Sequence, residues 1–257
     1  MQLAHERVSS GSGAGRPIVL VHGITERGEG WRPLVAPLAE DHVVLVVDLR
    51  GHGASPKGDR YDPLTLATDV HDTVIAADLG SEAPLMIGHS LGGVVVSAYA
   101  AMFPTRGVID VDQPLRLAGF KDALAQLEPM LRGSRESFEE AIGMVFASMV
   151  GPLDAEQAAR IAGLRQADQH VVLGIWGTVF DSTPEELDAQ VGALAGGITV
   201  PYLSLHGIDP GDEYAAWLTG VVPSATVEVW ADHGHYPHLI DQSRFLDRVR
   251  AFDATLV

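Results

Sequence analysis

The chain has 257 residues, of which 46% are hydrophobic and 20% are charged, as is typical of a globular protein with a sizeable core. Seventeen Lys and Arg residues against 34 Asp and Glu residues give a formal net charge of −17, which disfavours nucleic acid and anionic membranes as partners. The absence of cysteine excludes disulfides, thiolate metal sites and cysteine nucleophiles. We therefore expect a globular protein whose partner is a neutral small molecule.

The N-terminal region shows no targeting signal. Residues 1–15 contain charged residues and a Ser/Gly-rich stretch, but no apolar run of the kind found in a signal peptide. Elsewhere no segment reaches the roughly 18 uncharged apolar residues that suggest a transmembrane helix. We therefore expect a cytoplasmic protein that does not bind or cross a membrane.

The first half of the chain alternates between strand-like and helix-like segments. Four short runs are continuously apolar and rich in β-branched residues, which is the pattern of strands buried on both faces of a parallel sheet. These runs are residues 17–22, 43–48, 84–89 and 107–112. The segments with helical spacing between them are residues 31–40, 64–79 and 91–103. This alternation predicts an α/β fold with a mostly parallel, doubly wound sheet.

The second half of the chain begins with a long helical segment. From residue 113 to about residue 197 the strand pattern is absent, and apolar residues recur every three or four positions. The strand pattern then resumes at residues 201–205 and 226–230, and residues 242–252 have the spacing of a closing helix. The sheet is therefore expected to be interrupted by a helical insertion and completed after it.

The most specific chemical signal is a G-x-S-x-G motif at residues 88–92. It directly follows one predicted strand and directly precedes a predicted helix, which is the context of a serine nucleophile in a tight strand-to-helix turn. Only glycine at positions 88 and 92 leaves room for the backbone to cross closely there. The alternative is a helix start at which Ser90 is merely the N-cap.

Three more motifs occur in the order found in the α/β-hydrolase family, and with the G-x-S-x-G motif they make the sequence resemble that family over nearly its whole length. His22-Gly23, after the first predicted strand, is similar to the family's HG turn before the oxyanion loop. Residues 48–55 (DLRGHGAS) resemble its D-x-R-G-x-G-x-S loop. Gly234-His235, after the last predicted strand, resembles the segment that carries the catalytic histidine.

The resemblance implies a domain organisation. Residues 1–112 and 198–257 would form a core of the α/β-hydrolase type, and residues 113–197 lie where the family commonly carries a helical cap over the active site. Family members often begin with a hairpin of two strands, whereas only residues 2–8 are available here. We therefore expect one edge strand to be shortened or missing.

Ser90 and His235 are the candidate nucleophile and base. A serine hydroxyl is a poor nucleophile at its own pKa, so it needs a base within hydrogen-bond reach, and the base needs an orienting acid. His235 follows a strand and precedes the final helix, at the family's position. With His233 and His238 it forms an H-x-H-x2-H spacing that could suggest a metal site. No second cluster of ligands accompanies this spacing, so we expect neither a metal ion nor another cofactor.

The sequence leaves two candidates for the acid. The family order Ser, Asp, His favours Asp209, which follows the strand at residues 201–205. Its Gly-x-Asp spacing is one residue shorter than is usual in the family. Some members instead place the acid at the end of the strand before the insertion, where Asp112 stands in this chain. Either aspartate could instead be a loop or helix-capping residue.

The remaining site residues would bind the oxyanion and the substrate. Acyl transfer needs about two N–H donors for the developing negative charge. The backbone N–H of Leu91 would supply one donor, and the resemblance implies that of Ile24 as the other. Apolar side chains that could line a substrate pocket are Trp31, Phe146, Trp176 and Phe180.

Together these features predict a serine hydrolase that cleaves a neutral, moderately hydrophobic carboxylic ester through an acyl-enzyme on Ser90. The same fold also supports cofactor-free oxygenases, perhydrolases and carbon–carbon bond hydrolases. A non-catalytic binding protein that has kept the fold is a further alternative.

Overall fold

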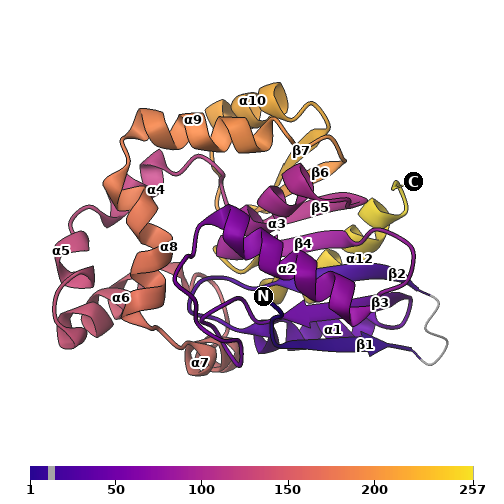
Figure 1. Ribbon diagram of the computed structural model, residues 1–257, viewed down its shortest axis with the longest axis horizontal. Coiled ribbons are helices and arrows are strands. Elements are labelled where there is room, and N and C mark those ends of the chain that lie inside the picture. The colour runs from indigo at the N-terminus through magenta and orange to yellow at the C-terminus, as the bar shows by residue number, and fades with distance from the viewer. Residues whose placement is uncertain (11–14, 257) are drawn as a thin grey trace.

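A mostly parallel sheet forms the centre of the protein (Figure 1). The computed structural model describes residues 1–10 and 15–256, and within them seven strands pair in the order β1-β3-β2-β4-β5-β6-β7. The strands are β1 (His5–Ser9), β2 (Arg16–Val21), β3 (His42–Val47), β4 (Leu85–His89), β5 (Gly107–Val111), β6 (Tyr202–His206) and β7 (Ala225–Val229). β1 is antiparallel to β3, and the other neighbouring pairs are parallel.

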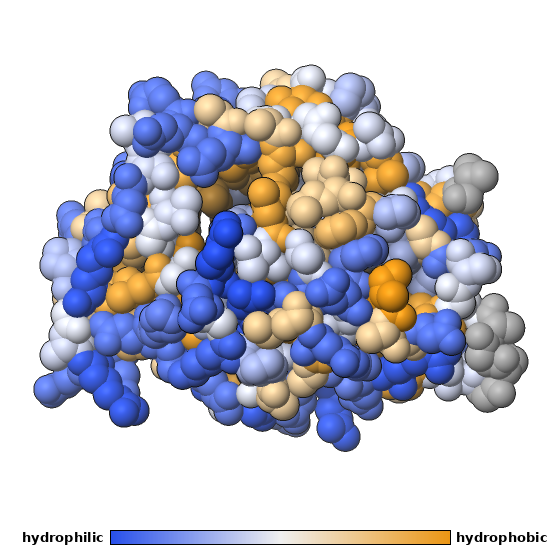
Figure 2. Space-filling model, viewed as in Figure 1, coloured by the Kyte–Doolittle hydropathy of each residue, from blue (hydrophilic) through white to orange (hydrophobic). Residues whose placement is uncertain are grey.

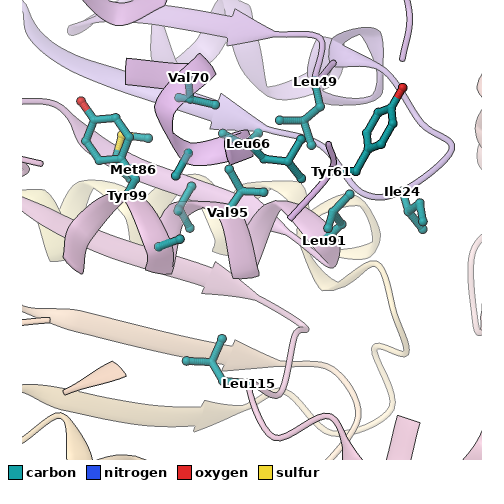
Figure 3. Close-up of a cluster of buried hydrophobic side chains, with 14 of the residues drawn as sticks. Ile24, Leu49, Tyr61, Leu66, Val70, Met86, Leu91, Val95, Tyr99 and Leu115 are labelled. Carbon is teal, nitrogen blue, oxygen red and sulfur yellow. The ribbon is translucent and has the colours of Figure 1, made fainter. Parts of the chain in front are cut away.

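Helices cover both faces of the sheet, because the central strands are apolar on both sides. In β4, for example, Met86 faces one hydrophobic cluster, whereas Leu85 and Ile87 face the other. The first cluster lies under α2 (Pro63–Ala77), α3 (Leu91–Met102) and α10 (Asp212–Val221). The second lies under α1 (Arg32–Leu38) and α12 (Gln242–Asp253), and the short helices η1 (Gly28–Trp31) and α11 (Pro237–Ile240) lie in loops. Figure 3 shows Leu66, Val70, Val95 and Tyr99 filling the layer around α2 and α3.

A helical insertion separates β5 from β6. It lies beyond the ends of the strands, at the left and top of Figure 1. Its helices are α4 (Ala118–Leu124), α5 (Glu128–Leu131), α6 (Arg135–Met149), α7 (Ala155–Leu164), α8 (Gln169–Asp181) and α9 (Pro184–Ala195). The four longest begin at side chains that accept a hydrogen bond from the first turn, which are Ser134, Asp154, Asp168 and Thr183.

The expected α/β fold class is confirmed, and the six strands expected from the sequence agree with β2 to β7 to within one residue at each end. A single strand, β1, precedes β2 at the N-terminal edge of the sheet. α10 was not expected from the sequence. None of the helices in residues 1–10 and 15–256 combines the length and hydropathy needed to cross a membrane.

Candidate active site

Ser90 occupies the sharp turn between β4 and α3. Its backbone angles, φ 52° and ψ −124°, lie in a region that residues with a side chain rarely adopt. The neighbouring glycines allow this turn. A Cβ atom on Gly88 would lie 2.1 Å from the carbonyl oxygen of Gly92, and one on Gly92 would lie 2.2 Å from that of Val21. The strained turn holds Ser90 at the carboxyl end of β4, where it borders a cavity.

His235 pairs with Asp112. Nδ1 of His235 donates a hydrogen bond of 2.7 Å to Oδ2 of Asp112, and both side chains are buried. The other carboxylate oxygen, Oδ1, accepts bonds from the N–H groups of Gly207 (2.8 Å) and Ile208 (3.2 Å). Every oxygen of the carboxylate is therefore bonded, which fixes the orientation of the acid and of the imidazole ring.

The same contacts influence the ionisation of the pair. Burial opposes ionisation of Asp112, but the hydrogen bonds from His235, Gly207 and Ile208 outweigh it and lower the pKa of the carboxyl. Burial lowers the pKa of His235 below its ordinary value, although the hydrogen bond to Asp112 raises it in part. A neutral imidazole beside an ionised carboxylate is the state that can accept a proton from a serine hydroxyl.

Asp209, the other candidate acid, lies elsewhere. Its side chain is exposed, and its Oδ1 accepts a hydrogen bond from the N–H of Gly211 within the same loop. The position beside the imidazole is taken by Asp112, which also binds the N–H groups of Gly207 and Ile208 just before Asp209. The structure therefore brings His235 to Asp112 and not to Asp209.

Short contacts connect the backbone around Ser90 to the His235–Asp112 pair. The N–H of Ser90 donates to the carbonyl oxygen of Val111, the residue before Asp112. The preceding residue, His89, donates from Nε2 to the carbonyl oxygen of His235 at 2.8 Å, and the two imidazole rings are 4.6 Å apart. Across residues 1–10 and 15–256 no hydrogen bond involves the Ser90 hydroxyl. In serine enzymes without bound substrate, the distance between the serine hydroxyl and the catalytic imidazole is often long.

The N–H groups expected to bind an oxyanion belong to residues close to Ser90. Leu91 is the first residue of α3, so its N–H has no acceptor within the helix. A Cβ atom on Gly23 would lie 3.3 Å from Cβ of Ser90, which places the loop that contains Ile24 against the serine. Ile24 and Leu91 both border the cavity together with Ser90. Figure 3 shows their side chains near Tyr61 beyond the strand ends.

Backbone strain is concentrated at this site. Five non-glycine residues in the described parts of the chain have positive φ, and three of them are Thr25 (63°), Ser90 (52°) and Asp112 (53°). Thr25 is β-branched, so its left-handed conformation is costly. Its carbonyl oxygen accepts a 2.7 Å hydrogen bond from the N–H of Gln166, in the helical insertion. The insertion therefore directly contacts the loop at residues 22–26, which we call the oxyanion loop because Ile24 is expected to bind an oxyanion.

A second contact between the core and the helical insertion was not anticipated from the sequence. The hydroxyl of Tyr236 donates to Oε1 of the buried Glu26 at 2.9 Å and accepts from Arg165 of the insertion at 3.1 Å. Burial opposes ionisation of Glu26, but contacts with His89 and Tyr236 outweigh it and lower the pKa of this carboxyl. No distinguishing signal in the sequence marks Glu26, because Arg27 and Glu29 follow it in the same loop.

The cavity beside Ser90 has a volume of about 610 Å³, within the usual range of small-molecule sites. Two of the four aromatic residues expected in a pocket, Phe146 and Trp176, line it. Trp31 does not: it lies buried on the other face of the sheet, against His238 and Phe245. Phe180 is buried within the insertion, one turn after Trp176 and under the guanidinium of Arg132. The expectation for Trp31 and Phe180 is therefore corrected.

The three histidines of the H-x-H-x2-H spacing diverge. His233 is half-buried and bonds to the carbonyl oxygen of Ala231, His235 bonds to Asp112, and His238 is buried beside Trp31. In the parts of the chain that the structure describes, no three His, Asp or Glu side chains come together as a metal site would require.

Comparison with known proteins gives a consistent result. Residues 18–249 match the sequence profile described as the alpha/beta hydrolase family. An uncharacterized protein of Mycobacterium tuberculosis is 26% identical over 264 residues, which cover 94% of this chain and 76% of that protein. An esterase of Escherichia coli is 37% identical over 90 residues, or 35% of each chain. The solved structure of a hydrolase from Oleispira antarctica matches with a TM-score of 0.81 at 17% identity, over 99% of this chain and 95% of that one.

Proposed function

Because the chain belongs to the alpha/beta hydrolase family, we propose that it is a serine hydrolase that cleaves a neutral, moderately hydrophobic carboxylic ester. The observation that carries the proposal is the arrangement at the carboxyl ends of β4 and β5. There Ser90 stands in a strained turn, and the neighbouring strand ends in the aspartate that holds His235. A strained serine next to a buried His–Asp pair is the constellation that acyl transfer requires.

In the proposed mechanism, Oγ of Ser90 attacks the ester carbonyl carbon while Nε2 of His235 accepts the hydroxyl proton. The N–H groups of Ile24 and Leu91 stabilise the negative charge on the carbonyl oxygen. The imidazolium, stabilised by Asp112, then gives its proton to the departing alcohol, which leaves an acyl-enzyme. Water, deprotonated by His235, attacks the acyl carbon in the same way and releases the acid.

The helical insertion acts as the cap of this site. Phe146 and Trp176 contribute apolar surface to the cavity, and Gln166 bonds to the oxyanion loop. The net charge of −17 favours a neutral substrate over an anion. The similarity to an esterase of Escherichia coli supports ester cleavage as the reaction.

The test is covalent labelling with a fluorophosphonate, followed by measurement of the intact mass. We expect one adduct on the wild-type protein and none on Ser90→Ala. The same substitution should lower kcat for p-nitrophenyl butyrate by about four to six orders of magnitude. Ser224→Ala is the matched control: this exposed serine bonds only to the carbonyl oxygen of Val200, and its variant should label like the wild type.

The alternatives give different results in the same assay. A binding protein without catalysis would neither label nor hydrolyse esters. A cofactor-free oxygenase would consume oxygen with its substrate, and a perhydrolase would need peroxide. Labelling that survives Ser90→Ala would overturn the proposal.

A further inference from the structure

The cavity is much longer than the immediate surroundings of Ser90 require. One of its walls is α3, to which Leu91 and Val94 contribute near the nucleophile and Ala101 and Met102 in the last turn. Because an α-helix rises 1.5 Å per residue, the wall from Leu91 to Met102 is about 16 Å long. The cavity is therefore an elongated groove that leads away from the reacting atoms.

The opposite wall is α9 of the helical insertion. Leu187, Val191 and Leu194 line the groove from this side, at spacings of three and four residues that place them on one helix face. Figure 1 shows α9 running above α3 and roughly along it. At the far end, a Cβ atom on Gly197 would lie 3.1 Å from Cβ of Ala101, so the two walls approach each other there.

The lining of the groove is mostly apolar, with Gln113, Thr178 and Gln190 among its polar residues, and it offers no cation among the described residues. Asp62 is the one charged residue among the described residues that line it. Its carboxylate is occupied, because Oδ1 accepts from the N–H of Thr65 and Oδ2 from Arg60 and the Thr65 hydroxyl. Figure 2 shows the recess under α9 as a hollow with hydrophobic walls and a hydrophilic surround. A hydrocarbon chain fits this lining, and an anionic group would find no partner in it.

The groove is lined by the residues proposed to bind the oxyanion and not by the proposed base. His235 does not line it, whereas Ile24 and Leu91, whose N–H groups would bind the oxyanion, do. In the proposed reaction the alcohol leaves with a proton from His235, so the alcohol occupies the imidazole side. The groove is left for the acyl chain.

We propose that the groove between α3 and α9 binds a linear, unbranched acyl chain of about twelve carbons, so that the preferred substrates are esters of medium to long fatty acids. An extended alkyl chain built from C–C bonds of about 1.5 Å advances about 1.25 Å per carbon, and 16 Å therefore accommodates about twelve carbons. The groove ends where Gly197 meets Ala101, and Met102 beside this contact is 43% exposed, so a longer chain would have to leave the groove for water there. This inference rests on the proposed serine hydrolase function.

The experiment measures kcat/KM for p-nitrophenyl esters with acyl chains of two to sixteen carbons. Each methylene that enters the groove should raise kcat/KM by up to roughly fourfold, and the value should rise at least about tenfold between four and twelve carbons. Beyond about twelve carbons the rise should stop, because further methylenes stay in water. Alkyl acetates with alcohols of increasing length should show no comparable rise.

Two substitutions on α9 locate the effect. Val191→Trp narrows the middle of the groove and should lower the ratio of twelve-carbon to four-carbon kcat/KM at least about tenfold. Ala189→Trp adds the same side chain on the exposed side of the same helix and should leave the ratio at the wild-type value. If Val191→Trp does not fold, Val191→Ser replaces the apolar side chain with a smaller polar one, removes its apolar contact and should lower the ratio in the same direction.

The outcomes separate this inference from the function on which it rests. Fluorophosphonate labelling with ester turnover that falls steadily beyond four carbons would overturn the acyl groove and leave the serine hydrolase intact. A rise in kcat/KM with the length of the alcohol rather than of the acyl chain would also overturn the acyl groove and leave the serine hydrolase intact. Absence of both labelling and turnover would overturn the hydrolase and the groove together.

Discussion

The core and the helical insertion contribute to the site in different ways. In the core, the groups proposed to react sit in strained or fully bonded positions: Ser90 and Asp112 have positive φ, and the carboxylate of Asp112 has a partner at both oxygens. The insertion contributes apolar side chains on ordinary helices, such as Trp176 on α8 and Val191 on α9. In the proposed reaction, the chemistry depends on the positions of a few atoms, whereas substrate choice depends on the shape of a surface to which many residues contribute.

After Ser90→Ala, the largest effect should come from the acid of the core. Asp112→Asn keeps the size of the side chain but removes the carboxylate that orients His235, and we expect kcat to fall by about three to four orders of magnitude. Asp209→Asn is the matched control and should retain wild-type turnover, because Asp209 only caps its own loop. Circular dichroism checks that both variants fold. A severe loss in Asp209→Asn with none in Asp112→Asn would reverse the assignment.

The pH profile of kcat/KM should report His235. The imidazole accepts a proton only when neutral, so activity is present above its pKa and is lost as the pH falls through it, by about tenfold per pH unit. Burial lowers that pKa, so the inflection should lie below the ordinary histidine value of about 6.5. Substitutions on the groove side of α9 should leave the inflection unmoved. An inflection that shifted with Val191→Ser would indicate that the two regions do not divide their roles in this way.

Tyr236→Phe should have an intermediate effect, because Tyr236 joins the two regions. The substitution leaves the buried Glu26 carboxylate without its hydroxyl donor and Arg165 without its acceptor. We expect the free energy of unfolding to fall by about 1–3 kcal/mol. We also expect a lower kcat with little change in KM, because the oxyanion loop loses a support.

Tyr99→Phe is the control for this prediction. Tyr99 is an equally buried tyrosine whose hydroxyl contacts His71, far from the oxyanion loop. Thermal unfolding and steady-state kinetics measure both variants. Equal effects of the two substitutions on kcat would show that the Tyr236 hydroxyl does not support the oxyanion loop.

The smallest effects on turnover should come from the insertion. Trp176→Leu removes part of the cavity wall, so we expect KM to rise severalfold with kcat little changed, since the lost contact is made equally in the ground and transition states. Phe180→Leu makes the same kind of change one turn along α8, at a residue that does not line the cavity. It should lower the melting temperature and leave KM unaltered. A rise in KM in Phe180→Leu alone would contradict the observed lining.

The sequence predicted the parts of the site that follow from local geometry. Ser90 stands out because a strand-to-helix turn with two close backbone approaches needs glycine at fixed positions on either side. The choice between Asp112 and Asp209 could not be made in this way. β5 and β6 are neighbouring parallel strands, so the residues after both of them reach the same edge of the sheet. The N–H groups of Gly207 and Ile208, which bind Asp112, distinguish the two only in three dimensions.

The cavity lining was less predictable for a related reason. Trp31 and Trp176 are both large, apolar and close in sequence to site elements, yet one packs under the opposite face of the sheet. Helical periodicity shows that Phe180 is buried but not against which neighbours. Which neighbours a side chain packs against depends on how the helices of the insertion pack together. A single sequence position carries little information about this packing.

The insertion leaves the sheet directly after Asp112 and returns to it at β6, the strand paired with β5. All the groups proposed to react therefore lie outside the stretch between these two neighbouring points. A recombination event, or a protein engineer, could graft a different set of helices there and exchange one substrate range for another without moving the nucleophile, base or acid. The transplanted segment would still have to supply a donor to the carbonyl of Thr25, as Gln166 does now.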